Sequence, residues 1–145
     1  MISSVETSTD YIKADIPIRL ESLNKKVHWA EAARQTKAQK TSVRMIMQSA
    51  LKNIDPPCQV TLIRVAPRTF DEDNLIGSFK AIRDEIADML IPGLAPGRAD
   101  SCPDIKWIYK QQKAVKEYSV VIEVRQKKSA TEKTAALFAD DESTN

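Results

Sequence analysis

Four segments of the chain alternate hydrophobic and polar residues in the manner of extended strands. They are residues 12–20, 59–67, 105–110 and 118–125. Pro17 suggests that the first of them lies at an edge of the sheet, or that Pro17 belongs to its first turn, since proline cannot donate a ladder hydrogen bond. The second is apolar on both faces, which is typical of a central strand. The last two lie close together in the sequence, so we expect them to pair as an antiparallel hairpin.

Two longer segments repeat their apolar residues at helical spacing. Residues 29–51 form the first, and Asp55-Pro56-Pro57 ends it. The second covers about residues 73–90, with residues 71–74 as material for an N-terminal cap. The order β-α-β-α-β-β predicts an α/β (α+β) fold, a small mixed sheet with two main helices.

Length and composition place this pattern in one domain. A chain of 145 residues with 42% hydrophobic and 29% charged residues is typical of a soluble globular protein. We expect residues 1–11 to be a flexible arm, residues 12–127 the single domain and residues 128–145 a disordered tail. No apolar run is long enough for a membrane span, and no signal-peptide layout is seen, so we expect a cytoplasmic protein with no membrane partner. Cys58 and Cys102 are expected to be reduced thiols.

The net charge of +2 conceals a strong segregation along the chain. Residues 25–52 and 105–128 are mainly basic, whereas the segment between them is mainly acidic. Such flanks suit a polyanion held over a metal site, although solvated helix faces alone would give the same pattern. The candidates for phosphate contacts are Lys25, Lys26, Arg34, Lys37 and Lys40.

The acidic segment begins with Phe70-Asp71-Glu72-Asp73-Asn74-Leu75, where a strand gives way to a helix. Side chains two apart on extended backbone point the same way, so Asp71 and Asp73 are expected to converge. Paired carboxylates suit Mg²⁺, with Mn²⁺ as an alternative. If residues 105–110 run antiparallel to residues 59–67, Asp100 or Asp104 would face the pair. The alternative is that these aspartates serve only as turn and cap residues.

The chain resembles the RusA family of Holliday-junction resolvases, in its phage and prophage members. The resemblance rests on residues 71–75, on Phe79-Lys80 and Asp84, on Asp100-Ser101 followed by residues 105–109, and on residues 23–30 with 37–40. It covers roughly residues 12–124. The resemblance implies an α/β homodimer that binds four-way DNA junctions and makes paired, Mg²⁺-dependent nicks with 5′-phosphate ends.

The resemblance also implies roles for single residues. It assigns the catalytic, metal-binding carboxylates to Asp71, Asp73 and Asp100, and a bracing role to Asn74. Two positions depart from the family pattern. Ala99 replaces one acid of a pair, which Asp104 could compensate as a ligand, and Gly77 replaces a catalytic lysine. Lys80 lies one turn further along the same helix face and could reach a phosphate, or it could simply pair with Asp84.

The leading hypothesis is therefore a junction-resolving endonuclease acting in DNA recombination or repair. Two rivals remain open. One is a DNA-binding protein of the same fold that does not cleave. The other is a different metal-dependent phosphohydrolase that acts on a small nucleotide.

Overall fold

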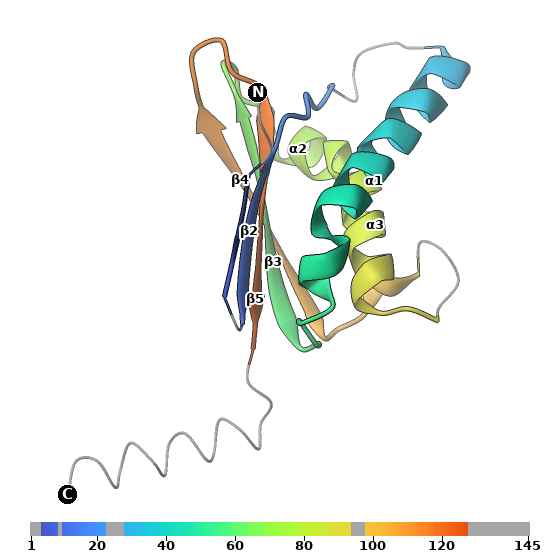
Figure 1. The fold of residues 1–145 in the computed structure, drawn as a ribbon. Coiled ribbons are helices and arrows are strands. Elements are labelled where there is room, and N and C mark those ends of the chain that lie inside the picture. The colour runs from blue at the N-terminus through green and yellow to red at the C-terminus, as the bar shows by residue number, and fades with distance from the viewer. Residues whose placement is uncertain (1–3, 9, 23–27, 94–97, 128–145) are drawn as a thin grey trace, which may run out of the picture.

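Five strands form one mixed sheet, and the helices all cover the same face of it (Figure 1). The computed structural model describes residues 4–8, 10–22, 28–93 and 98–127. The elements in chain order are β1 (Ser4–Thr7), β2 (Tyr11–Ile16), α1 (Trp29–Leu51), β3 (Cys58–Ala66), α2 (Glu72–Ser78), α3 (Lys80–Leu90), the 3₁₀ turn η1 (Ala99–Ser101), β4 (Ile105–Lys113) and β5 (Ser119–Gln126). The mixed α+β class predicted from the sequence is confirmed.

The order of the strands across the sheet is β1-β2-β5-β3-β4. β3 runs parallel to β4, and the other neighbouring strands are antiparallel. The predicted hairpin between residues 105–110 and 118–125 is therefore wrong, because β3 lies between β4 and β5. The short connection after β4 crosses the end of β3 instead, and Ala114 N donates to Ala66 O at 3.1 Å as the chain leaves β4.

Other element boundaries also differ from the sequence-based expectation. Ser4–Thr7 lie in the range predicted as a flexible arm, but they form β1 because β2 offers an open edge for pairing. β2 ends at Ile16, directly before Pro17. The helix expected over residues 73–90 is divided at Phe79, whose side chain is fully buried. The disorder predicted for residues 128–145 lies outside the described residues.

The core lies between the sheet and the three helices. Val60 and Leu62 of β3 and Ile122 of β5 meet Met47 of α1 and Phe79, and all five are completely buried. Burying side chains of this size stabilises a fold by about 1.5–3 kcal/mol each. Of the helices in the described ranges, none is long and apolar enough to cross a membrane. The packed core thus holds β3, α2 and α3 in place. These elements position the acidic residues Asp71, Asp73 and Asp84.

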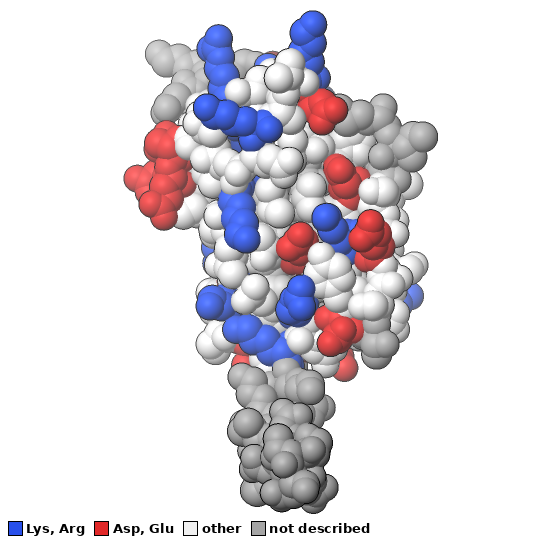
Figure 2. Space-filling model, turned by 90° about the vertical axis from the view of Figure 1, so that its left-hand side faces the viewer, with Lys and Arg blue, Asp and Glu red and all other residues white. Residues whose placement is uncertain are grey.

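Figure 2 shows the face of the sheet that the helices leave uncovered. Charges of both signs alternate there: Glu6 pairs in register with Lys13, and Lys13 with Glu123. The Arg125 guanidinium lies 4.9 Å from the centre of the Tyr11 ring on the same face. Lysines and arginines stand out at the top of the view and again near the bottom, with acidic side chains between and beside them. This face is therefore mixed in sign.

Candidate functional site

Asp71 stands at the turn between β3 and α2 and caps the helix. Its backbone is extended (φ −66°, ψ 163°), and its Oδ2 accepts a hydrogen bond from Asn74 N at 3.3 Å. The cap role considered from the sequence is confirmed. The predicted convergence of Asp71 and Asp73 is not confirmed, because α2 already begins at Glu72. Asp73 lies in the first helical turn, and helical positions two apart do not face each other. Both carboxylates are exposed to solvent.

Two side chains from the sheet hold this turn in place. Gln111 of β4 accepts from Phe70 N at 2.7 Å and donates to Phe70 O at 2.8 Å. Arg64 of β3 donates to Arg68 O at 2.5 Å, and its guanidinium lies 3.5 Å from the centre of the Phe70 ring. Burial lowers the pKa of Arg64. The sequence reasoning missed both residues, because no local pattern relates Gln111 to a turn 41 positions earlier.

Asp100 lies in η1 and is tied to α3 and β4. Its Oδ2 is 3.4 Å from Arg83 Nε, and its carbonyl oxygen accepts from Arg83 Nη2 and from Trp107 Nε1, both at 3.0 Å. Arg83 also donates to Tyr109 Oη at 2.6 Å. The network restrains Asp100 from two elements, α3 and β4, at once.

The predicted meeting of Asp100 with Asp71 and Asp73 relied on an antiparallel pair of strands, and that pairing is wrong. β3 and β4 are parallel, with Cys58 opposite Ile105, so the entrance of β4 lies beside the start of β3. Asp71 follows the other end of β3. Arg83, the partner of Asp100, is about 15 Å along α2–α3 from Asp73 at the usual helical rise. Asp104 belongs with the start of β3, since its carbonyl accepts from Cys58 N at 2.9 Å.

Within the described ranges, no three His, Cys, Asp or Glu side chains lie close enough to hold a metal ion together. The structure accordingly does not gather the predicted set of three aspartates. The exposed carboxylate of Asp71, or that of Asp73, fits Mg²⁺ as it is commonly bound, through one carboxylate with water and substrate phosphate filling the other positions. Asp100 does not fit as a ligand while its carboxylate is paired with Arg83.

A cleft of about 550 Å³ separates α1 from the junction of α2 and α3, and Lys40, Lys80, Asp84 and Gly77 are among the residues that line it. Lys80 Nζ lies 3.7 Å from Asp84 Oδ2, so the ion pair weighed from the sequence is present. The Lys80 side chain is 78% exposed. Such an exposed ion pair is weak, and Lys80 can exchange it for another anion at little cost.

Asp84 is the acidic residue that the sequence reasoning undervalued. It is buried, and its Oδ1 has no hydrogen-bond partner. Burial raises the pKa of Asp84, Asp100 and Asp88 raise it further, and Lys80 and Lys40 act in the opposite direction. A buried carboxylate with a perturbed pKa in a cleft is typical of a functional site. The available signal was its position four residues after Lys80, on the same helix face.

The remaining predicted residues fall on or near α1. Arg34 and Lys37 are exposed on α1, and Lys40 is half-buried at the cleft. Lys25 and Lys26 lie outside the described residues. The Asn74 side chain donates to Ser22 Oγ at 2.9 Å, so it links α2 to the segment before α1 while its backbone supports Asp71.

Comparison with known protein families finds no family model that matches the chain, and no curated protein matches it either. The positions and contacts of the residues described above are therefore the basis for proposing a function.

Proposed function

We propose that this protein is a Mg²⁺-dependent endonuclease that nicks branched DNA, with the Holliday junction as its preferred substrate, in the cytoplasm and in the course of recombination or repair. A junction has two-fold symmetry, so paired nicks require two matched copies of the chain, and we include a homodimer in the proposal.

The observation that carries the proposal is the placement of Asp71 and Asp73. Asp71 is exposed at the exit of a central strand, on a turn fixed by Gln111 and Arg64, and Asp73 is exposed in the first turn of α2. Rigid presentation of ligands favours a site over a mere turn, because each ligand is held before the ion arrives. Two exposed lysines belong to the neighbouring elements, Lys80 in the cleft and Lys113 at the end of β4. This combination suits a phosphodiester beside a hydrated cation.

Each of these residues would have its own role in the proposed reaction. Asp71 and Asp73 supply anionic oxygen ligands, and Asn74 N keeps Asp71 oriented. Mg²⁺ held there would supply a water of lowered pKa and would neutralise the charge that develops on the phosphate. Lys80 releases Asp84 and pairs with a phosphate oxygen, while Arg34 and Lys37 contact the backbone without reading sequence. Binding is then expected to weaken steeply with salt.

A second candidate is a protein that binds branched DNA without cutting it. The ion pair of Asp100 with Arg83 favours this candidate, because a neutralised carboxylate is a poor metal ligand. Gly77 in place of a lysine points the same way. The two candidates share their DNA contacts and differ only in turnover.

A nicking assay separates the candidates. A synthetic four-way junction, a linear duplex of equal length and a nucleoside monophosphate are incubated with the protein in Mg²⁺ or Mn²⁺. The proposal predicts nicks in the junction strands alone. Junction binding without nicks supports the second candidate, and release of phosphate from the nucleotide supports a different phosphohydrolase.

A further inference from the structure

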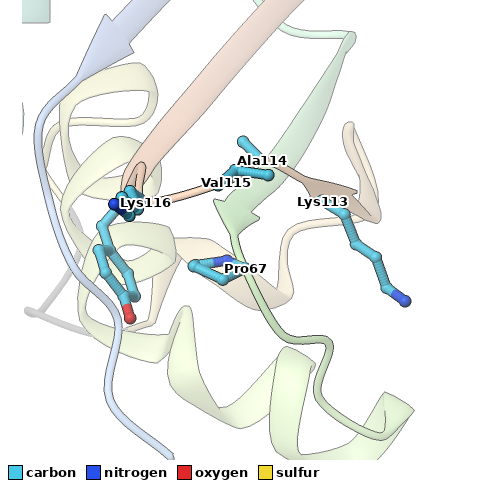
Figure 3. A pocket seen from close by; sticks show the side chains of 6 residues that line it. Pro67, Lys113, Ala114, Val115 and Lys116 are labelled. Atoms are coloured by element: carbon cyan, nitrogen blue, oxygen red, sulfur yellow. The ribbon is translucent and has the colours of Figure 1, made fainter.

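The connection from β4 to β5 arches over the end of β3 and encloses an apolar notch. The arch is required because β3 lies between the two strands that residues 114–118 join. Lys116 makes the bend with a positive φ of 58°. Figure 3 shows Pro67 beneath Ala114 and Val115, with the Lys113 side chain directed away. Pro67, Lys113, Ala114, Val115, Lys116 and Tyr118 line the notch, which has a volume of about 560 Å³.

The walls of the notch are suited to a flat ring. Pro67 and Val115 are apolar, and Val115 is 83% exposed, an unusual exposure for a β-branched aliphatic side chain. The Tyr118 ring carries the Arg19 guanidinium 4.2 Å from its centre, which holds the ring in place. Ligand sites typically combine mostly apolar walls with a few charged groups. Here the charged group is the exposed Lys116, since the Lys113 side chain is directed away.

The notch is rigidly connected to the acidic turn. Pro67 is followed by Arg68, whose carbonyl is held by Arg64, and by Phe70, which is clamped to Gln111. Asp71 is the next residue. Asp71 is four residues from Pro67, so a DNA strand whose phosphate lies at Asp71 would bring its neighbouring nucleotides toward the notch, where Lys116 matches the charge of their phosphates.

We propose that this notch holds one unstacked nucleobase of a branched DNA strand. The inference rests on the proposed function, since it takes the strand near Asp71 as the occupant. Bases at branch points and bulges are the cheapest to unstack. Stacking a base on an aromatic side chain gives a contact that every base can make, and removing the base typically lowers affinity about 5-fold or more.

The test measures binding in EDTA, where cleavage and bound metal play no part. The probes are a duplex with one bulged thymine, the same duplex with an abasic bulge, and the fully paired duplex. Wild type is expected to bind the thymine bulge at least about 5-fold more tightly than the abasic bulge. Val115→Ser removes most of that preference and leaves binding to the paired duplex unchanged. Met45→Ser is the matched control, since Met45 is 79% exposed on α1, and it keeps the preference.

Equal binding of the thymine and abasic bulges by wild type would overturn the proposal, and so would a preference that survives in Val115→Ser. Tyr118→Leu, checked for folding by its melting temperature, must lose the preference as well. The outcome is separable from the proposed nuclease function. If wild type nicks junctions in Mg²⁺ but binds the thymine and abasic bulges equally, only the base-binding role of the notch is contradicted. If wild type binds none of the probes, the proposed function itself is contradicted.

Discussion

Arg83 holds Asp100 by both its side chain and its backbone: Nε lies 3.4 Å from the carboxylate Oδ2, and Nη2 donates to the carbonyl oxygen at 3.0 Å. The same guanidinium lies 4.9 Å from the centre of the Trp107 ring and donates to Tyr109. A metal ion and this guanidinium would compete for one carboxylate. Asp100 is therefore available as a metal ligand only when the pair with Arg83 opens.

Arg83→Gln is predicted to lower stability and to leave the Mg²⁺ requirement of nicking unchanged. Loss of charge-assisted bonds inside a half-buried network costs about 1–3 kcal/mol in the free energy of unfolding, measured by urea denaturation. Asp100 precedes the entrance of β4 beside the start of β3, whereas Asp71 follows the other end of β3, so freeing Asp100 adds no ligand to an ion at Asp71 and the Mg²⁺ requirement of nicking stays the same. Arg98→Gln, an exposed neighbour of the same loop, is the control and should change neither value. A lower Mg²⁺ requirement in Arg83→Gln, or unchanged stability, would contradict this account of Asp100.

Substitutions at Asp71 separate its cap role from its metal role. Asparagine caps helices about as well as aspartate, so Asp71→Asn is expected to keep stability while it abolishes nicking. Asp71→Ala loses the acceptor for Asn74 N and is expected to unfold with about 1 kcal/mol less free energy. Thermal or urea denaturation of both variants, alongside junction nicking, checks the distinction. Full activity in Asp71→Asn would mean that the residue is only a cap.

Asp84→Asn is predicted to stabilise the protein at neutral pH. Burial raises the pKa of Asp84, so the folded state favours the protonated carboxyl, and the stability this contributes is lost as pH rises through that raised pKa. Asparagine keeps the shape without the buried charge, and a gain of about 1 kcal/mol is expected at pH 7. The gain should shrink on acidification to pH 4. Equal or lower stability of the variant at pH 7 would show that the pair with Lys80 dominates.

The two thiols are predicted to differ sharply in reactivity. Burial, with Cys102 next in effect, raises the pKa of Cys58 from 9.0 to about 11, whereas Cys102 is only half-buried. Iodoacetamide at pH 8 should therefore label Cys102 rapidly and Cys58 only after unfolding. The folded state holds the Cys58 proton more tightly, so the free energy of unfolding should fall between pH 9 and 11, by up to about 3 kcal/mol. Cys58→Ala should lack this part of the decline, and rapid labelling of both thiols would refute the assignment.

Local patterns in the sequence predicted the elements but not their pairing. Helix α1 begins and ends where the pattern placed it, since its boundaries depend on nearby residues such as the proline pair after Asp55. The insertion of β3 between β4 and β5 depends on long-range register, and a short connection suits a hairpin and a crossing equally well. β1 carries no apolar periodicity and forms only because β2 has a free edge.

The candidate site was predictable to a similar extent. The cap at Asp71 follows from residue type and position, and so does the Lys80–Asp84 pair. The restraint of Asp100 by Arg83 and of Phe70 by Gln111 depends on which elements pack together, which no spacing along the chain encodes. The prediction that Asp100 lies beside Asp71 was wrong for the same reason, because it depended on the direction of β4 relative to β3.

Nicking of a synthetic four-way junction in Mg²⁺ by wild type and by Asp73→Asn tests the central claim most directly. Asp73 is exposed and makes no cap bond with Asn74, so the variant should fold and bind the junction as wild type does. The account predicts paired nicks with 5′-phosphate ends from wild type and at least about a 100-fold lower rate from Asp73→Asn. Equal nicking by both proteins, or junction binding by wild type with no nicks in Mg²⁺ or Mn²⁺, would contradict it.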